Sequence, residues 1–312
     1  MTGYRDATAV VFGYHNVGVR CLSVLLAHGV RIPLVVTHED DPKENLWFGS
    51  VRRLAELNRI PVAVPENPNA PEFVEKIAAL KPDFLFSFYF RFMLQEPLLR
   101  IPRHGALNMH GSLLPKYRGR VPVNWAIIKG ERETGASLHY MEVKPDAGDL
   151  VDQQAVPILP DDTAIEVFNK VTLAAELVLD RSLPALMAGK APRQPLDLKA
   201  GSYFGRRTPE DGRIDWKQPA QAVHNLVRAV APPYPGAFGT AGGKPLRVLR
   251  SHYADEAAQH KSAELYAEGG RCYADCGDGC RIEVVVLELD GVAMDAARFT
   301  GRYGNQSLPL GD

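Results

Sequence analysis

Short apolar segments alternate with amphipathic segments through the first 110 residues, and this order restricts the fold more than any other feature of the chain. The apolar segments have the length of buried strands, and the segments between them have helical periodicity. Such alternation predicts an α/β fold with a doubly wound, mostly parallel sheet, whose ligands bind beyond the carboxyl ends of the strands. We expect strands at 8–14, 32–38, 61–64, 83–90 and 105–109, and helices at 17–28, 46–59 and 71–80.

The pattern changes after residue 134. Two β-like segments, 134–143 and 149–158, flank the turn KPDAGD and predict a hairpin with Asp146 at its tip. Thr163 and Glu166 then match a capping box, which predicts the start of a long helix that runs to about residue 186.

Short β-like segments recur in the last third of the chain, with one helical segment over 219–230. This pattern is typical of a small barrel-like domain. We therefore expect two domains, residues 1–200 and residues 205–312, the second of them the smaller and β-rich.

The candidate catalytic residues are Asn108, His110 and Asp146. Side chains alternate along a strand, so Asn108 and His110 project to the same side of the segment 105–110. An amide, an imidazole and a carboxylate are the groups that acyl transfer to an amine requires, without a serine or cysteine nucleophile. Taken singly, each has a plain structural explanation, and Asp146 before Ala-Gly is a common turn former.

Other residues near this motif are weaker candidates. Arg118 and Arg120 lie in the string PKYRGR, which favours an anion-binding role for them. No comparable set of polar residues accompanies His104 or His139 in the sequence, so we assign neither of them a catalytic role. The Gly13–Gly18 spacing is a weak match to a dinucleotide-binding loop, and a glycine that lets a strand–helix turn close is the favoured explanation.

Four cysteines are present, and three of them, Cys272, Cys276 and Cys280, follow a C-x3-C-x3-C spacing. Three thiolates could hold a metal ion, but the spacing is not that of a zinc knuckle and no fourth ligand is obvious. We therefore predict reduced thiols around a Gly-rich turn and no metal.

The charge balance excludes broad nucleic-acid binding, because 36 basic and 37 acidic residues leave a net charge of only −1. The N-terminus lacks the pattern of a secretory signal, and no apolar run approaches the ~20 residues that span a bilayer. A cytoplasmic protein without membrane or nucleic-acid partners is the expectation, and homo-oligomerisation is left open.

The strings N-x-H, GSLLPKYRG and DAGD together resemble the 10-formyltetrahydrofolate-dependent formyltransferases. The resemblance implies the Rossmann-like fold of that family, 10-formyltetrahydrofolate as co-substrate, no metal, and a catalytic triad at Asn108, His110 and Asp146. Over nearly the whole chain, further strings such as HEDDPKENLWFGSV and VRAVAPPYPGAF resemble the formyltransferase part of ArnA-type polymyxin-resistance enzymes. This narrower resemblance implies a folate pocket lined by Phe92, Met93, Leu94, Arg120, Glu142, Val143, Lys144 and Pro145.

The narrower resemblance also implies a substrate, the nucleotide sugar UDP-4-amino-4-deoxy-L-arabinose, and a role in lipid A modification and polymyxin resistance. Those enzymes typically carry a second, NAD-dependent decarboxylase domain that is not found in this sequence. Either a separate protein supplies that step, or the relationship is to a stand-alone sugar formyltransferase. The implied mechanism is attack of the substrate amine on the formyl carbon, with Asn108 and protonated His110 donating to the developing oxyanion and Asp146 orienting His110.

Three other functions remain as alternatives. A methionyl-tRNA formyltransferase would share the triad, but the mixture of acidic and basic residues in 205–312 weakens that interpretation. A non-catalytic folate-binding protein would have no reason to keep a proton-transferring group. A nucleotide-dependent oxidoreductase rests only on the weak Gly13–Gly18 match.

Overall fold

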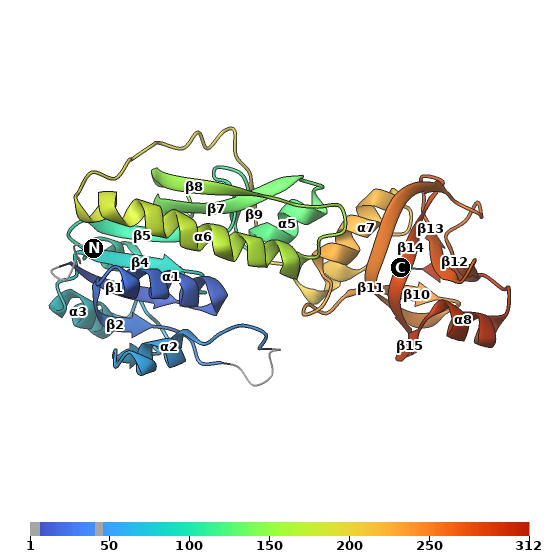
Figure 1. The fold of residues 1–312 in the computed structure, drawn as a ribbon, viewed down its shortest axis with the longest axis horizontal. Helices are drawn as coiled ribbons and strands as arrows, with labels where there is room; N and C mark the ends of the chain where they lie inside the picture. The colour runs from blue at the N-terminus through green and yellow to red at the C-terminus, as the bar shows by residue number, and fades with distance from the viewer. Residues whose placement is uncertain (1–6, 41–45, 312) are drawn as a thin grey trace. The chain divides into compact units, whose positions relative to one another are not determined.

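The computed structural model describes residues 7–40 and 46–311, and the elements from β1 to β9, which ends at Phe204, form the α/β part of the chain (Figure 1). The alternation expected from the sequence is present, although several elements are shorter than their apolar patterns. The helix expected over 46–59, for example, spans only Val51–Leu57, because the Ser50 side chain caps it by accepting from the Arg53 N–H. The elements are β1 (Thr8–Gly13), α1 (His15–Ala27), β2 (Arg31–Val36), α2 (Val51–Leu57), β3 (Val62–Ala63), α3 (Pro71–Ala79), β4 (Phe84–Phe88), α4 (Glu96–Leu99), β5 (Gly105–His110), β6 (Arg118–Gly119), α5 (Pro122–Ile128), β7 (Glu133–Tyr140), β8 (Leu150–Pro157), α6 (Ala164–Met187) and β9 (Tyr203–Phe204).

The main sheet has seven strands in the order β3-β2-β1-β4-β5-β7-β8. Strands β1 to β5 run parallel, whereas β7 pairs antiparallel with β5. The fold class expected from the sequence is therefore confirmed: a mixed α/β unit with a Rossmann-like, mostly parallel sheet. Because β5 lies between a parallel and an antiparallel neighbour, its carboxyl end is flanked by loops from both kinds of strand.

Helices cover the sheet in a way that the apolar pattern explains. Val10 and Phe12 of β1 share one hydrophobic cluster with Ile77 of α3 and Leu98 of α4. Helix α1 packs against β1 and β4, and it lies beside α6 through the ion pair of Arg20 with Glu176 at 2.6 Å. This burial holds the strand ends in fixed positions, and the candidate residues lie at one of those ends.

The C-terminal part forms a closed six-stranded β-barrel with a short seventh strand, β15, at one edge. Strand β11 pairs with β10 and also with β14, which closes the sheet on itself. The barrel encloses its own apolar core, and the expectation of a barrel-like C-terminal domain is confirmed. The elements here are η1 (Pro209–Gly212), α7 (Ala220–Ala229), β10 (Ala237–Ala241), β11 (Lys244–Ala257), β12 (Glu264–Glu268), β13 (Arg271–Asp275), β14 (Cys280–Leu289), β15 (Val292–Met294), α8 (Ala296–Tyr303) and β16 (Leu308–Gly311).

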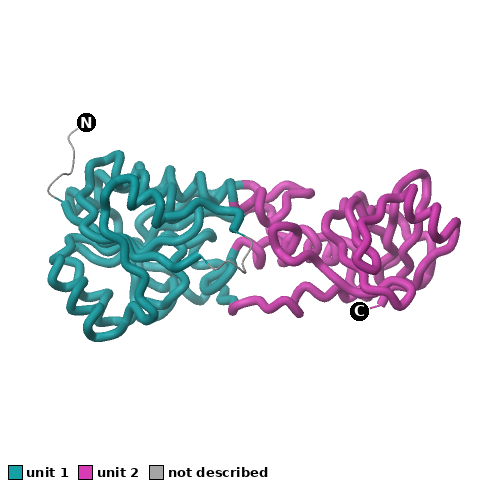
Figure 2. Tube along the Cα trace, turned by 90° about the horizontal axis from the view of Figure 1, so that it is seen from below, with its two compact units in different colours: residues 1–122, 134–156, 169–204 teal, residues 123–133, 157–168, 205–312 magenta. Residues whose placement is uncertain are grey.

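The chain divides into two compact units that interleave along the sequence (Figure 2). Unit 1 consists of Met1–Pro122, Thr134–Val156 and Asn169–Phe204. Unit 2 consists of Val123–Glu133, Pro157–Phe168 and Gly205–Asp312. The C-terminal unit thus contains two segments, residues 123–133 and 157–168, that precede the barrel in sequence.

No helix among the described residues is long and apolar enough to cross a membrane.

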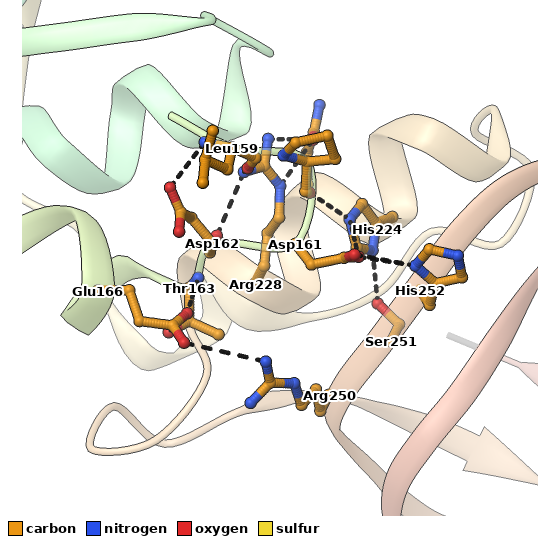
Figure 3. A network of polar contacts seen from close by, with 12 residues as sticks. Leu159, Asp161, Asp162, Thr163, Glu166, His224, Arg228, Arg250, Ser251 and His252 are labelled. Carbon is orange, nitrogen blue, oxygen red and sulfur yellow. Dashed lines mark hydrogen bonds and ion pairs between the residues drawn. The ribbon is translucent and has the colours of Figure 1, made fainter. Parts of the chain in front are cut away.

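A polar network fastens the segment 157–168 to α7 and β11 (Figure 3). The His224 ring donates from Nε2 to the Pro160 carbonyl at 2.9 Å, since a carbonyl can only accept, and its Nδ1 lies 2.9 Å from Ser251 Oγ. The carboxylate of Asp161 lies 2.9 Å from His252 Nδ1. The ring of His224 is therefore placed as a neutral imidazole with one donor and one acceptor.

The guanidinium of Arg228 adds a second set of bonds to the same segment. It donates to the carbonyls of Leu159 and Asp162 at 3.3 and 3.2 Å, and to Asn225 Oδ1 at 2.7 Å. Helix α6 begins within this segment, at Ala164, where the Glu166 carboxylate accepts from both the N–H and the Oγ1 of Thr163. The expected capping interaction is thus present, and the segment has a defined conformation within unit 2.

Stability should depend on pH through His224. Burial lowers the pKa of this imidazole below its ordinary value. Nearby Arg228 and His252 lower this pKa further, whereas the Pro160 carbonyl and Asp161 raise it. The unfolded chain takes up a proton near pH 6.5, whereas the folded chain resists it, so stability is complete above about pH 6.5 and decreases as the pH falls below it. We expect urea unfolding at pH 7.5 and 5.5 to show a smaller pH-dependent loss for His224→Gln than for the wild type. An equal loss in both proteins would contradict this assignment.

Candidate active site

The carboxyl end of β5 brings Asn108 and His110 to the same side of the sheet, as the alternation of side chains predicts. His110 is buried and Asn108 is partly buried. Antiparallel pairing with β7 places Asn108 directly opposite His139 and His110 directly opposite Ser137. Asn108 and His110 therefore lie on a paired strand rather than on a loop, and this pairing fixes the backbone of both residues.

Asp146 reaches this strand end from the loop between β7 and β8. Its backbone has a positive φ of 49°, in a region that Asp tolerates better than most residues. Its Oδ1 lies 3.6 Å from His110 Nδ1 and 3.5 Å from His139 Nε2. Its Oδ2 accepts the backbone N–H of Gly119 at 2.8 Å. The structure thus brings the three sequence-predicted residues together.

The charge state of Asp146 follows from these contacts. Burial alone would raise the pKa of the carboxyl, because burial disfavours the charged form. The charge of His110, the neighbouring His139 and the Gly119 N–H together outweigh burial and hold the pKa of Asp146 well below its ordinary value. The carboxylate therefore stays ionised at neutral pH and presents a fixed negative charge to both imidazoles.

The loop 112–120 holds the site from the other side. The His110 Nε2–H donates to the Tyr117 carbonyl at 2.8 Å, which leaves Nδ1 as the nitrogen that faces Asp146. Strand β6 in this loop pairs with β9, so the Gly119 amide is held in place for Asp146. In this conformation both ring nitrogens of His110 face groups of the protein, the Tyr117 carbonyl and the Asp146 carboxylate. The resemblance implied instead that this ring donates to the developing oxyanion.

The two arginines of the loop differ in environment. Arg120 is exposed. Arg118 is only 8% exposed, and its Nε has no hydrogen-bond partner within residues 7–40 and 46–311. No carboxylate of these described residues forms an ion pair with Arg118. A buried cation without a counter-ion is costly, so the environment of Arg118 leaves a charge of the protein unbalanced beside the site.

His139 is the residue of this site that sequence reasoning missed. Its side chain is 2% exposed, and its Nε2 lies 3.2 Å from Asn108 Nδ2 as well as close to Asp146. The signal that could have found it is the period-two spacing of Ser137 and His139 in a strand that pairs with β5. His104, the other histidine set aside, lies outside the site and contacts the ring of Phe84.

The segments that the resemblance assigns to a folate pocket lie in two loops at this edge of the sheet. Phe92 and Met93 are 43% and 48% exposed, whereas Leu94 is buried in the cluster of α3 and α4 and is a core residue in this conformation. Met141, at the start of the loop that carries Asp146, packs against that same cluster. The two loops are therefore neighbours.

The second of these loops also presents exposed side chains. The residues that follow Met141 in it are Glu142, Val143, Lys144 and Pro145, of which the first three are exposed.

Two other sequence features have structural explanations. A Cβ on Gly18 would lie 2.9 Å from Val51 Cγ2 and 3.2 Å from the Gly13 backbone, so this glycine allows α1 to pack closely against β1 and α2. All four cysteines are free thiols, and burial raises the pKa of Cys272 to about 11 and that of Cys276 to about 12. No group of three or more metal-ligating side chains was found in the described part of the chain.

Comparison with known proteins gives a consistent result. Residues 19–183, more than half of the chain, match the family described as "Formyl transferase", and residues 206–304 match "Formyl transferase, C-terminal domain".

Solved structures share the fold at low sequence identity. An N-formyltransferase from Helicobacter canadensis, in complex with folinic acid and dTDP-3-aminofucose, is 21% identical with a TM-score of 0.73, over 89% of this chain and 98% of that one. The sugar 3N-formyltransferase WlaRD, with dTDP and 5-N-formyl-THF, is 20% identical with a TM-score of 0.71, over 89% and 96%. HypX from Aquifex aeolicus, in complex with tetrahydrofolic acid, is 18% identical with a TM-score of 0.62, over 94% of this chain and 47% of that one.

Proposed function

From the premise that this chain belongs to the formyl transferase family and is a formyltransferase, we propose that it transfers a formyl group from 10-formyltetrahydrofolate to the amino group of a nucleotide-linked amino sugar. Similar structures with folinic acid or 5-N-formyl-THF beside dTDP or a dTDP-sugar support this class of substrate. The narrower sequence resemblance supports UDP-4-amino-4-deoxy-L-arabinose as the acceptor, with its 4-amino group as the nucleophile. That acceptor extends the proposal to lipid A modification and polymyxin resistance.

The single observation that carries the proposal is the convergence of Asn108, His110 and Asp146 at the carboxyl end of β5. One ionised carboxylate faces the imidazole of His110 at 3.6 Å, and an amide lies beside them. These groups can hold a proton and stabilise a developing negative charge, while the external amine serves as the nucleophile. Transfer of an acyl group to an external amine needs this combination.

The roles of the three residues follow from their contacts. Asp146 Oδ1 faces His110 Nδ1 at 3.6 Å, so the pair is placed to take up the proton that the attacking amine loses and to pass it on. Asn108 uses one amide N–H toward His139 and keeps a second N–H, which can donate to the formyl oxygen as charge develops on it. The folate, when bound, supplies the formyl carbon that the amine attacks; the bond from that carbon to the folate nitrogen then breaks, and tetrahydrofolate leaves with the proton on that nitrogen.

The residues at the neighbouring loops fit a folate. Exposed Phe92 and Met93 offer an aromatic ring and a thioether to a flat, apolar heterocycle. The loop 142–145 lies in the same chain segment as Asp146, so a heterocycle held between these loops is within reach of the catalytic carboxylate. We assign the folate to this edge, with Arg120 as an exposed cation for its anionic part.

A panel of acceptors tests the proposal. The protein is incubated with 10-formyltetrahydrofolate and, in separate reactions, UDP-4-amino-4-deoxy-L-arabinose, dTDP-amino sugars or methionyl-tRNA, and formylation is read by mass spectrometry. We expect a formylated nucleotide sugar and unchanged methionyl-tRNA. Formylation of the tRNA alone would refute the sugar assignment, and tight folate binding without any turnover would support a non-catalytic folate-binding protein.

Arg118 gives a separate prediction about the nucleotide. A guanidinium binds a phosphate through paired, charge-assisted hydrogen bonds, so Arg118→Met is expected to weaken binding of UDP about tenfold or more while leaving uridine and folinic acid unaffected. Because the wild-type side chain is a buried charge without a partner, the same variant should unfold at an equal or higher temperature. Isothermal titration and thermal unfolding measure both effects. A lower unfolding temperature with unchanged UDP affinity would assign Arg118 a purely structural role.

A further inference from the structure

His139 lies between two members of the candidate triad. It faces Asn108 across the paired strands β5 and β7, with Nε2 3.2 Å from Asn108 Nδ2 and 3.5 Å from Asp146 Oδ1. Its Nδ1 lies 2.8 Å from the carbonyl oxygen of Tyr140. All of the polar contacts of this buried ring are therefore made to groups in or beside the site.

The carbonyl of Tyr140 fixes which nitrogen of His139 carries hydrogen. A carbonyl oxygen can only accept, so the short contact at 2.8 Å requires a hydrogen on Nδ1. In the neutral ring Nε2 then has a lone pair and no hydrogen. Within the site, the group placed to donate to that lone pair is the Asn108 amide nitrogen at 3.2 Å.

This contact determines how the Asn108 amide is turned. If the amide were rotated by half a turn, its Oδ1 would face the lone pair of His139 Nε2, and two acceptors would oppose each other in a buried position. The observed orientation pairs one amide N–H with His139. It leaves the second N–H and the carbonyl oxygen Oδ1 for a ligand.

We propose that neutral His139 is a positioning residue, which holds the Asn108 amide in the orientation that presents an N–H to the formyl oxygen. The inference rests on the formyl transfer proposed above and deepens it. A second proton on His139 would place an Nε2–H toward Asp146 Oδ1 and remove the acceptor that Asn108 needs, so the two hydrogen-bonding patterns exclude each other. His139 acts through Asn108 and does not touch the reacting atoms.

Two substitutions of His139 distinguish the contribution of Nδ1 from that of Nε2. Asparagine at this position can still donate to the Tyr140 carbonyl but has no acceptor near the place of Nε2, whereas the longer glutamine side chain can put its amide oxygen there. We expect His139→Asn to lower kcat for formyl transfer about 10- to 100-fold with KM for the folate unchanged, because the oxyanion donor is misplaced rather than removed. We expect His139→Gln to keep kcat within about threefold of the wild type. His104→Gln is the matched control and should leave kcat unchanged.

A double-mutant cycle tests whether His139 works through Asn108. In an Asn108→Ala background, the added His139→Asn change should lower kcat by less than about twofold, because there is no amide left to orient. Full additivity of the two losses would overturn the proposal, as would wild-type kcat in His139→Asn. Folinic acid binding, measured on each variant, confirms that the folded site is intact.

The tautomer provides a readout that does not depend on turnover. Nitrogen NMR of the ¹⁵N-histidine-labelled wild-type protein, with His139→Gln used to assign the signal, should show His139 protonated at Nδ1 and unprotonated at Nε2 near neutral pH. Protonation at Nε2 would overturn the inference whatever the substrate is. Failure of every nucleotide sugar in the acceptor panel would instead count against the proposed function and leave the tautomer result standing.

Discussion

Replacement of Asp146 by Asn is expected to lower kcat for formyl transfer by about 10²- to 10⁴-fold, the range that a positioned acid–base group contributes. The substitution is nearly isosteric, and the new amide oxygen can still accept the Gly119 N–H that Oδ2 accepts at 2.8 Å. What disappears is the negative charge that faces His110 at 3.6 Å and His139 at 3.5 Å. Rapid-quench kinetics with a nucleotide amino sugar would measure the loss of the chemical step.

Asp149→Asn is the matched control, because it makes the same chemical change in the same loop without touching either imidazole. It should retain kcat within about twofold, and both variants should bind folinic acid like the wild type. A decrease of less than tenfold for Asp146→Asn would remove this carboxylate from the chemistry. Because the pKa of Asp146 is held well below its ordinary value, its ionisation adds no acidic limb to the pH–rate profile above about pH 4.

The second large effect is expected for Gly119→Ala. Gly119 has a φ of +98°, which L side chains rarely adopt, and a Cβ there would lie 2.2 Å from the Phe204 carbonyl oxygen. Strands β6 and β9 must separate to admit it, and this movement takes away the amide that binds Asp146. We expect a loss of at least about 1 kcal/mol in the free energy of unfolding and a loss of about 10²-fold in kcat.

Gly205→Ala is the control for this change. It follows β9 directly, a Cβ there meets nothing within 4 Å, and its φ lies outside the strained range. Urea unfolding and kcat should both be close to the wild type. Equal behaviour of the two alanine variants would show that the pairing of β6 with β9 does not support the site.

The sequence predicts the part of the site that one strand determines. Alternation along 105–110 is enough to place Asn108 and His110 on one side, and the order of strands and helices is enough to place them at the carboxyl edge of the sheet. The turn KPDAGD likewise predicts Asp146 at the tip of a hairpin, and the structure places it in the loop between β7 and β8. These features are local, so the spacing of side chains along the chain is sufficient information.

The parts that the sequence does not predict depend on contacts between distant segments. The pairing of His139 with Asn108 depends on the register between β5 and β7, and a shift of one residue would turn His139 away. The Tyr117 carbonyl and the Gly119 amide are backbone groups, present at every residue, so residue identity cannot reveal their role. Leu94 depends on such contacts as well, because it packs in the core cluster with Ile77 of α3 and Leu98 of α4 while its neighbours Phe92 and Met93 are exposed.

The interleaved units have a consequence for engineering. Residues 158–163 lie between β8 and α6 in sequence, yet carbonyls among them accept from His224 and Arg228 of α7. A chimaera joined only after Phe204 would supply those acceptors from one parent and the donors from another. Transplanting a barrel between enzymes of this type therefore calls for matched splices at every point where the chain passes from one unit to the other.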